Sequence, residues 1–522
     1  MAQPFRVVVI GGVAAGPKIA AKVARLRPDA EVTLIEKGER LSYAGCGLAY
    51  YIADMVREQQ SLMTTPAGVV RDVAFFQNVK NVKVLSRTEA LEIDRGAKRV
   101  LVKSSTDGSQ RWIEYDKLAL ATGARPVVPP IPGVGLANVF TLKTIEEADR
   151  IKEFIAANPH CKMVIVGGGL IGVEMAEALV GRKLEVTLVE MLPHILAPLD
   201  TEMALLVEKH MRANEVELLT NTWVEAFDGA DQVEYVVTSQ ERIATDAVVL
   251  AVGVRPQIEL AKAAGIEIGS TGAIRVDEHM RTSDPDIYAA GDCVETINLV
   301  SGRPVYAPLG STANKQGRVA AIAICGGDER FPGVLCSAIV KVFDFNAGWT
   351  GLSESAAREL GYEVAAGLVP APDRSDYYPG KRMVMLKLIA EGATGRLLGA
   401  QAIGPGETAK RLDVAVTAIS AGMTADQVSK LDLCYAPPYS AAMDSIITAA
   451  NVIRNKIAGQ MNGVSSIELG RRLDRGEDIV VLDVRSPAEY ESGHLEGAIN
   501  IPLGALRKRC GELPRDRKIV AY

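Results

Sequence analysis

A single cysteine, Cys46, stands between two glycines in the segment Ser42-Tyr43-Ala44-Gly45-Cys46-Gly47-Leu48-Ala49-Tyr50. Glycine has no side-chain bulk, so a cofactor ring and the sulfur of a substrate could both approach that thiol. A cysteine thiolate is a nucleophile and a redox group, and it forms when a nearby cation, a helix N-terminus or a bound cofactor lowers the thiol pKa from about 8.5. We therefore expect Cys46 to be the redox centre. The alternative interpretation is a small, buried and unreactive residue.

The composition is that of an ordinary globular chain, and its 522 residues suggest roughly three to four domains. Lys and Arg number 58 and Asp and Glu number 64, so the net charge of −6 favours neither nucleic acid nor an anionic membrane as a partner. No apolar run approaches the ~18 residues of a membrane span, and the first residues show no signal-peptide pattern. The seven cysteines are scattered without a CxxC pair, which argues against a disulfide scaffold, a zinc site or an iron–sulfur cluster. We expect no metal and a reducing, cytoplasmic location.

The elements that would position Cys46 begin directly before it. Residues 6–10 predict a buried strand, residues 17–26 a helix, and residues 31–36 a second strand that ends in an acid. The turn between the first strand and the helix would hold a pyrophosphate at the helix N-terminus, and the acid would bind an adenosine ribose. The expected contact residues are Gly11, Gly12, Ala14, Ala15, Gly16, Glu36 and Lys37. Val13 departs from the GxGxxG fingerprint, and the alternative is a tight turn without a nucleotide.

Three cations follow one face of the first predicted helix. Lys18, Lys22 and Arg25 are spaced i, i+4 and i+7. A solvated helix face is the usual meaning of this spacing. A cationic face close to Cys46 could instead bind the phosphates of an anionic thiol substrate.

The same layout returns in the middle of the chain. A strand at 163–166 precedes Gly167-Gly168-Gly169-Leu170-Ile171-Gly172, a complete fingerprint, and a helix at 173–181 and a strand at 185–190 follow. The contacts expected from Gly167, Gly169, Gly172 and Glu190 imply a second dinucleotide. An acid at the strand end hydrogen-bonds a ribose 2′-hydroxyl and repels a 2′-phosphate, so NADH is expected over NADPH.

Shorter strands surround the two units. Runs at 82–85, 90–94 and 100–102, with the stretch around Trp112, predict a small meander. A buried strand from residue 117 ends at Thr122-Gly123, and a strand from residue 248 ends in a similar turn at Gly253. A further strand ends at Gly291-Asp292, where the carboxylate could hold a ribityl hydroxyl of a flavin.

Together the two fingerprints, the Thr-Gly strand end and the Ala-Gly-Asp motif resemble the flavin-dependent pyridine nucleotide–disulfide oxidoreductases, over about residues 5 to 455. The segment Ser42-x-x-x-Cys46-Gly47-Leu48-x-Tyr50 is similar to the single-cysteine branch. That branch includes coenzyme A-disulfide reductases, NADH-dependent persulfide and polysulfide reductases, and NADH oxidases or peroxidases. The chain departs from its pattern in carrying Gly45 where Asn is frequent and Ala49 where Pro is usual.

The resemblance implies FAD in the first unit and NADH in the second, and a homodimer with shared active sites. It implies that the helix at 309–320 points its N-terminus, with Leu309 and Ala313, at the flavin. It also implies a dimerisation domain whose Tyr435, and either Tyr377 or Tyr378, reach the cysteine of the other subunit. Ser42, Cys46, Tyr378 and Tyr435 are the expected catalytic set. The alternative for the tyrosines is ordinary amphipathic packing.

Residues 479–502 resemble the first half of a rhodanese, a sulfurtransferase domain. The chain as given ends at a strand, 518–522, that in rhodaneses leads into the cysteine loop, and Cys510 is not at the family position. The tail as given is therefore not expected to carry a persulfide. Either the natural tail is degenerate and covers a surface, or the sequence has been cut short.

These observations predict an α/β protein with two Rossmann-like domains, an α+β dimerisation domain and a partial rhodanese-like tail. The expected limits are 1–117 with 252–330 for FAD, 118–251 for NAD, 331–455 for dimerisation and 462–522 for the tail. The predicted function is FAD-dependent, NADH-driven reduction of coenzyme A persulfide or polysulfide through Cys46, because the tail favours sulfane sulfur. Alternatives are a coenzyme A-disulfide reductase, an NADH oxidase or peroxidase with a cysteine sulfenic acid, and a redox-sensing flavin-binding protein.

Overall fold

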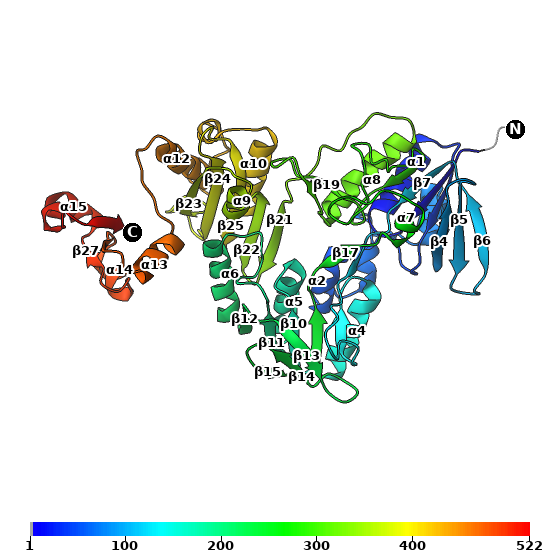
Figure 1. The fold of residues 1–522 in the computed structure, drawn as a ribbon, viewed down its shortest axis with the longest axis horizontal. Coiled ribbons are helices and arrows are strands. Elements are labelled where there is room, and N and C mark those ends of the chain that lie inside the picture. Colours follow the sequence, from blue (N-terminus) through cyan, green and yellow to red (C-terminus); the bar gives the residue numbers. More distant parts are fainter. Residues whose placement is uncertain (1–3) are drawn as a thin grey trace. The chain divides into compact units, whose positions relative to one another are not determined.

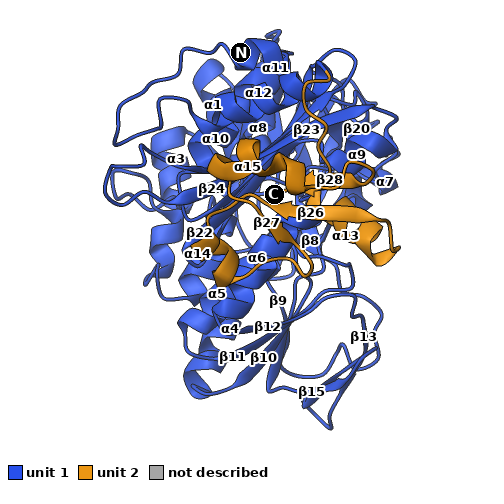
Figure 2. Ribbon diagram, turned by 90° about the vertical axis from the view of Figure 1, so that its left-hand side faces the viewer, with its two compact units in different colours: residues 1–458 blue, residues 459–522 orange. Residues whose placement is uncertain are grey.

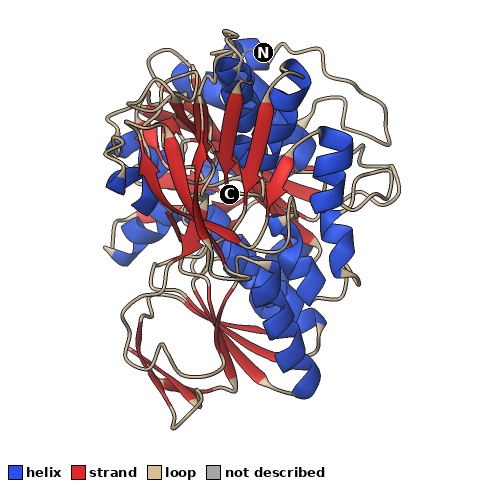
Figure 3. Cartoon of the chain, turned by 90° about the vertical axis from the view of Figure 1, so that its right-hand side faces the viewer, coloured by secondary structure: helices blue, strands red, loops and turns tan. Residues whose placement is uncertain are grey.

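The computed structural model describes residues 4–522, which form two compact units, 4–458 and 459–522 (Figures 1 and 2). The α/β prediction is confirmed. Helices flank the strands of the parallel sheets (Figure 3). No helix within the described residues is both long and apolar enough to cross a membrane.

The first nucleotide unit is built on a five-stranded parallel sheet, in the order β18 (Ile287–Ala289), β7 (Lys117–Leu120), β1 (Arg6–Ile10), β2 (Glu31–Ile35) and β3 (Lys83–Leu85). Alternate residues of β1 enter opposite cores. Val7 and Val9 pack with α1 (Ala15–Leu26) and α8 (Gly310–Ile324), whereas Val8 and Ile10 pack on the other face. Burial on both faces explains why the four residues of β1 that follow Arg6 are all apolar.

Two expectations for this region were wrong. Residues 82–85 were expected in the meander, but β3 pairs with β2 in the parallel sheet, and the meander contains only β4 (Thr88–Asp94), β5 (Arg99–Ser104) and β6 (Gln110–Glu114). The domain limit at 117/118 would cut β7, whose residues pair with β1. Helix α3 (Val73–Lys80) leads into β3, and α7 (Glu259–Ala263) packs on β4.

The second nucleotide unit repeats this architecture. Its parallel sheet has the order β12 (Val216–Leu219), β11 (Glu185–Val189), β10 (Lys162–Val166), β16 (Ala247–Leu250) and β9 (Val139–Thr141). Its helices are α4 (Ile145–Ala157), α5 (Leu170–Gly181) and α6 (Thr201–Ala213). A small antiparallel sheet follows, of β13 (Val224–Asp228), β14 (Tyr235–Thr238) and β15 (Arg242–Ala244). Helix α5 begins three residues before the expected start, because it continues directly from the glycine turn.

Two chain segments cross between these units as an antiparallel pair, β8 (Ala124–Pro126) and β17 (Val254–Pro256). The compact unit that contains both nucleotide units has a third part, which is an antiparallel sheet. Its strand order is β21 (Ala338–Val342), β22 (Phe345–Gly351), β25 (Leu397–Gly404), β24 (Met383–Glu391) and β23 (Val364–Pro372). Its helices are α9 (Glu354–Glu359), α10 (Ala409–Ser420), α11 (Ala425–Val428) and α12 (Ser445–Ile457). The short pair β19 (Thr296–Ile297) and β20 (Pro304–Val305) precedes this part.

The C-terminal compact unit, residues 459–522, has a central strand β26 (Ile479–Asp483), which pairs in parallel with β27 (Ile499–Asn500) and β28 (Lys518–Ala521). In sequence, helix α13 (Ser466–Asp474) precedes β26, α14 (Pro487–Ser492) lies between β26 and β27, and α15 (Leu503–Arg509) lies between β27 and β28. Asp483 is fully buried and pairs with Arg485 at 2.6 Å, which holds the turn after β26.

Candidate active site

Cys46 lies in a single turn of 3₁₀-helix, Gly45–Gly47, that continues into α2 (Leu48–Ile52), and the residue is exposed. The two flanking glycines have different roles. The space around Gly45 is open, which fits access to the thiol, whereas a Cβ on Gly47 would lie 2.5 Å from Leu62 Cδ2. A side chain at position 47 would therefore force the tip of Leu62 to move.

Ser42 ties this segment to the first glycine turn. Its N–H donates to the carbonyl of Gly12 at 2.8 Å, and its φ of +50° is in the left-handed region that few residues other than glycine adopt. Such a strained residue persists only where its surroundings fix it. The cysteine segment is thus anchored at a set distance from the nucleotide turn.

The thiol faces the N-terminal end of α8. A Cβ built on Gly310, the first residue of that helix, would lie 3.9 Å from Cys46 Sγ. Backbone N–H groups at a helix N-terminus carry partial positive charge, which favours an anion there. That this helix also points its N-terminus at a flavin stays a prediction.

Charges near Cys46 act in opposite directions. Burial and the negative charge of Glu174 raise the pKa of the Cys46 thiol, and the positive charge of Lys143 lowers it. The sequence predicted a lowered pKa, and in the chain alone the net shift is upward because desolvation dominates. Lys143, from the segment before α4, is the cation that acts most strongly on Cys46, rather than any cation of α1.

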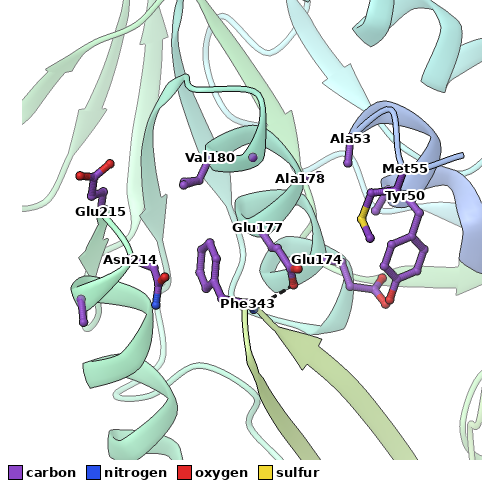
Figure 4. A pocket seen from close by; sticks show the side chains of 13 residues that line it. Tyr50, Ala53, Met55, Glu174, Glu177, Ala178, Val180, Asn214, Glu215 and Phe343 are labelled. Carbon is purple, nitrogen blue, oxygen red and sulfur yellow. Dashed lines mark hydrogen bonds between the residues drawn. The ribbon is translucent and has the colours of Figure 1, made fainter. Parts of the chain in front are cut away.

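Glu174, in the first two turns of α5, was not predicted as a site residue. It lines a cavity of about 460 Å³ together with Tyr50 (Figure 4). Burial, with the charge of Glu177, raises the pKa of Glu174 to about 7, and burial followed by the charge of Glu174 raises the pKa of Tyr50. Among residues 4–522, Glu174 has no hydrogen-bond or ion-pair partner in the structure. The sequence feature that could have identified Glu174 is its position two residues after Gly172, the last glycine of the second fingerprint.

The first parallel sheet brings the expected flavin contacts to one edge. All five strands run in the same direction, so the turns after β1, β2, β7 and β18 share the carboxyl edge of the sheet, where such folds bind nucleotides. Residues at or next to these turns are Gly11, Gly12, Ala14, Ala15, Gly16, Glu36, Lys37, Thr122, Gly123, Gly291 and Asp292. A Cβ on Gly16 would lie 1.7 Å from the carbonyl of Gly11, so this glycine lets the helix begin directly against the turn.

Hydrogen bonds pre-position the acids of this edge. Glu36 accepts from the N–H groups of Gly12 at 2.6 Å and Gly38 at 2.7 Å. Asp292 pairs with Lys143 at 3.0 Å, and the buried side chain of Gln316 on α8 accepts from Gly291 N at 2.9 Å. Leu309 and Ala313 lie at the start of α8. These residues fit a flavin nucleotide: a glycine turn for the pyrophosphate, and acids for ribose and ribityl hydroxyls.

The second edge repeats the arrangement. The buried Glu190 accepts from Gly168 N at 2.6 Å and Leu192 N at 2.8 Å. A Cβ on Gly172 would lie 1.9 Å from the carbonyl of Gly167. Gly169 is the N-cap of α5, and Gly253 follows β16 at the same edge. These residues fit a second dinucleotide.

The other expected residues lie elsewhere. Lys18 and Arg25 on α1 are exposed, and Lys22 acts on Cys325 at the far end of α8. Tyr377, Tyr378 and Tyr435 are 76%, 36% and 51% exposed on two loops next to the antiparallel sheet. Their contact with a second subunit stays a prediction.

Comparison with known proteins identifies the class. Models of the pyridine nucleotide-disulphide oxidoreductase, its dimerisation domain and the rhodanese-like domain match residues 5–312, 337–446 and 465–522. The first match covers more than half of the chain, so the protein belongs to the pyridine nucleotide-disulphide oxidoreductase family. It is an oxidoreductase that uses a flavin and a pyridine nucleotide, as predicted from the sequence.

Three relatives show which members of this family the chain is similar to. The chain is 47% identical to a solved structure titled an NAD-dependent persulfide reductase from A. fulgidus, with a TM-score of 0.95 over 99% of this chain and 94% of that one. It is 38% identical to a protein of Pyrococcus abyssi named NAD(P)H sulfur oxidoreductase (CoA-dependent), over 86% of this chain and 98% of that protein. It is 37% identical to the NAD(P)H coenzyme A polysulfide/persulfide reductase of Pyrococcus horikoshii, over 86% and 98%.

Proposed function

We propose that the protein is an FAD-dependent reductase that uses NADH to cleave the sulfur–sulfur bond of coenzyme A persulfide or a polysulfide through Cys46. The observation that carries the proposal is the position of Cys46, an accessible thiol at the N-terminal end of α8, next to the carboxyl edge of the first nucleotide sheet. The names of the relatives and the rhodanese-like tail support a sulfane-sulfur substrate. The scattered thiols fit a reducing, cytoplasmic compartment.

The cofactor assignment follows from the two acids. Glu36 would bind the adenosine ribose of FAD. Glu190 would accept from the 2′-hydroxyl of NADH and repel the 2′-phosphate of NADPH. Lys18, Lys22 and Arg25 would bind the phosphates of the coenzyme A moiety.

The Cys46 thiolate attacks the outer sulfur of the persulfide. The bond between the two sulfurs breaks, the coenzyme A thiolate leaves, and Cys46 holds the transferred sulfur as a cysteine persulfide. When bound, the flavin held by the first nucleotide unit would supply the two electrons, taken from NADH, that reduce this new sulfur–sulfur bond. Hydrosulfide then leaves and the Cys46 thiolate is restored, so that each NADH oxidised releases one hydrosulfide.

We further propose that the active enzyme is a homodimer. The matched dimerisation domain contains Tyr378 and Tyr435, whose phenols would stand beside Cys46 of the other subunit. A phenol there can donate a hydrogen bond to the leaving thiolate. Ser42 would keep Cys46 in register with the flavin.

The test is anaerobic NADH oxidation by the purified flavoprotein, with coenzyme A persulfide and coenzyme A disulfide at equal concentration. We expect the persulfide to be the better substrate and hydrosulfide to appear in equal amount to the NADH consumed. Cys46→Ser should abolish the activity and retain the flavin. Cys510→Ser, an equally conservative change at another exposed cysteine, should have no effect.

Three outcomes would contradict the proposal. Full activity in Cys46→Ser would exclude the cysteine mechanism. A strong preference for the disulfide would make the enzyme a thiol-pool reductase, and NADH oxidation that depends on oxygen alone would make it an oxidase.

A further inference from the structure

Two loops of the antiparallel-sheet part carry the tyrosines assigned to the shared active site. Tyr377 and Tyr378 lie between β23 and β24, and Tyr435 lies between α11 and α12. All three side chains are at least one-third exposed. Exposed aromatic side chains on loops have many available orientations, so an active site that uses them needs the loops themselves to be fixed.

One buried side chain contacts the bases of both loops. Arg411, in the first turn of α10, is 1% exposed. Its Nη2 donates to the carbonyl of Asp373 at 2.7 Å, at the start of the first loop, and to Oδ2 of Asp444 at 2.9 Å, at the end of the second. Its Nε donates to the other oxygen of Asp444 at 3.3 Å, which makes the pair bidentate.

Further hydrogen bonds complete this network. Nη1 of Arg411 donates to the carbonyl of Glu407 at 2.8 Å. The loops also contact each other directly, because Ser375 N donates to the carbonyl of Pro437 at 3.2 Å and Ser375 Oγ to that of Ser440 at 3.3 Å. A guanidinium has five donors in a rigid plane, so it fixes the direction of each partner as well as its distance.

We infer that Arg411 is a positioning residue that sets the two tyrosine loops for the active site of the other subunit. The inference rests on the proposed function, since it requires these tyrosines to act on the partner's Cys46. Lysine cannot replace the arginine fully, because an ammonium is a point charge and cannot bind both oxygens of Asp444 in one plane. A misplacement of about 1 Å at a reacting group can lower the rate by about a hundredfold.

The test uses mixed dimers, in which each chain carries a different affinity tag. A dimer of an Arg411→Gln chain with a Cys46→Ser chain has one site that combines a native cysteine with native loops from the other chain. A second dimer pairs a wild-type chain with a chain that carries both changes. Its one native Cys46 comes from the wild-type chain, and the loops opposite that cysteine come from the chain with the Arg411→Gln change. We expect the first dimer to have about half the wild-type kcat, and the second to be about ten- to a hundredfold slower.

A purely structural role within each chain would give the opposite ranking, with the second dimer at half activity and the first impaired. Equal activities would also overturn the inference. Loss of sulfur-dependent NADH oxidation in the wild-type dimer would instead refute the proposed function, so the two failures are distinguishable.

Asp444→Asn provides a second variant in case Arg411→Gln does not fold. The amide oxygen can still accept from Ile446 N at the start of α12, where Asp444 is the N-cap, while the charge opposite Arg411 is removed. We expect the same ranking of mixed dimers. Arg411→Lys should recover part of the activity in the impaired dimer, since it keeps the charge.

Discussion

Replacing Lys387 by methionine should destabilise the protein more than any loss of a surface ion pair. Lys387 on β24 is 3% exposed on its side chain, and its Nζ lies 2.9 Å from Asp200, 2.8 Å from Glu354 and 2.5 Å from Glu202. The three carboxylates form a group of the kind that can hold a metal ion, but the ammonium lies within bonding distance of each. Asp200 precedes α6, so the cluster joins the second nucleotide unit to the antiparallel sheet.

The magnitude follows from burial. Removing one partner of a buried ion pair costs about 3–5 kcal/mol, because the remaining charge stays desolvated without compensation. Glu202 and Glu354 are 15% and 24% exposed, so water relieves part of the loss and the lower end, about 3 kcal/mol, applies. An unfolding entropy of about 2.1 cal/mol/K per residue over the 458-residue unit is about 1 kcal/mol/K, so Tm should fall by about 3 °C.

Differential scanning calorimetry of Lys387→Met, with equal flavin content in all samples, measures this shift. Lys162→Met is the matched control: this lysine also lies on a strand and pairs with Glu185, but both side chains are more than half exposed. Its pair should contribute less than about 1 kcal/mol. Equal Tm values for the two variants would refute the reasoning, since burial would then make no difference.

The pH dependence has a definite sign. Burial alone would raise the pKa of Glu354, but the charge and hydrogen bond of Lys387 outweigh it and hold that pKa below the usual 4.5. A carboxyl with a depressed pKa stabilises the fold above the unfolded pKa and loses that contribution as the pH falls. The gap in Tm between wild type and Lys387→Met should therefore narrow below about pH 4.5.

Three further changes test the site. Glu174→Gln should lower the pKa of Cys46, because the charge that Glu174 acquires above pH 7 is removed; the pH profile of iodoacetamide alkylation measures this, and an unchanged profile would contradict the assignment. Glu190→Ala should raise KM for NADH about ten- to a hundredfold without raising that for NADPH, and a parallel rise in both would indicate loop damage instead. Gly317→Val should reduce flavin retention, because a Cβ there would already lie 2.8 Å from the carbonyl of Ala15 where α1 meets α8, and normal retention would show that the helices can separate.

The elements that the sequence predicted best are those with a local signal. Both nucleotide units combine an apolar strand, a glycine turn, a helix and a terminal acid within about 30 residues, and the carboxylates of Glu36 and Glu190 lie where that pattern requires. The strand at 83–85 was assigned to the wrong sheet, because its partner β2 lies about 50 residues earlier and side-chain periodicity does not encode a pairing partner.

The electrostatic environment of Cys46 was less accessible to sequence reasoning for a related reason. Lys143 is placed by the capping box of α4, in which Thr144 and Glu147 hydrogen-bond each other's backbone N–H groups. Glu174 is placed by α5, and Gly310 by α8. Each local structure is regular, but nothing in the three segments separately indicates that they meet at one thiol.

This arrangement limits what the motif around Cys46 can determine. Its glycines allow access and packing, but burial and the charge of Glu174 raise the pKa of the Cys46 thiol, while the charge of Lys143 lowers it. Whatever lowers the net negative potential at the thiol, such as protonation of Glu174, shifts the balance toward the thiolate. The reactivity of Cys46 is therefore a property of the assembled site and not of the motif alone.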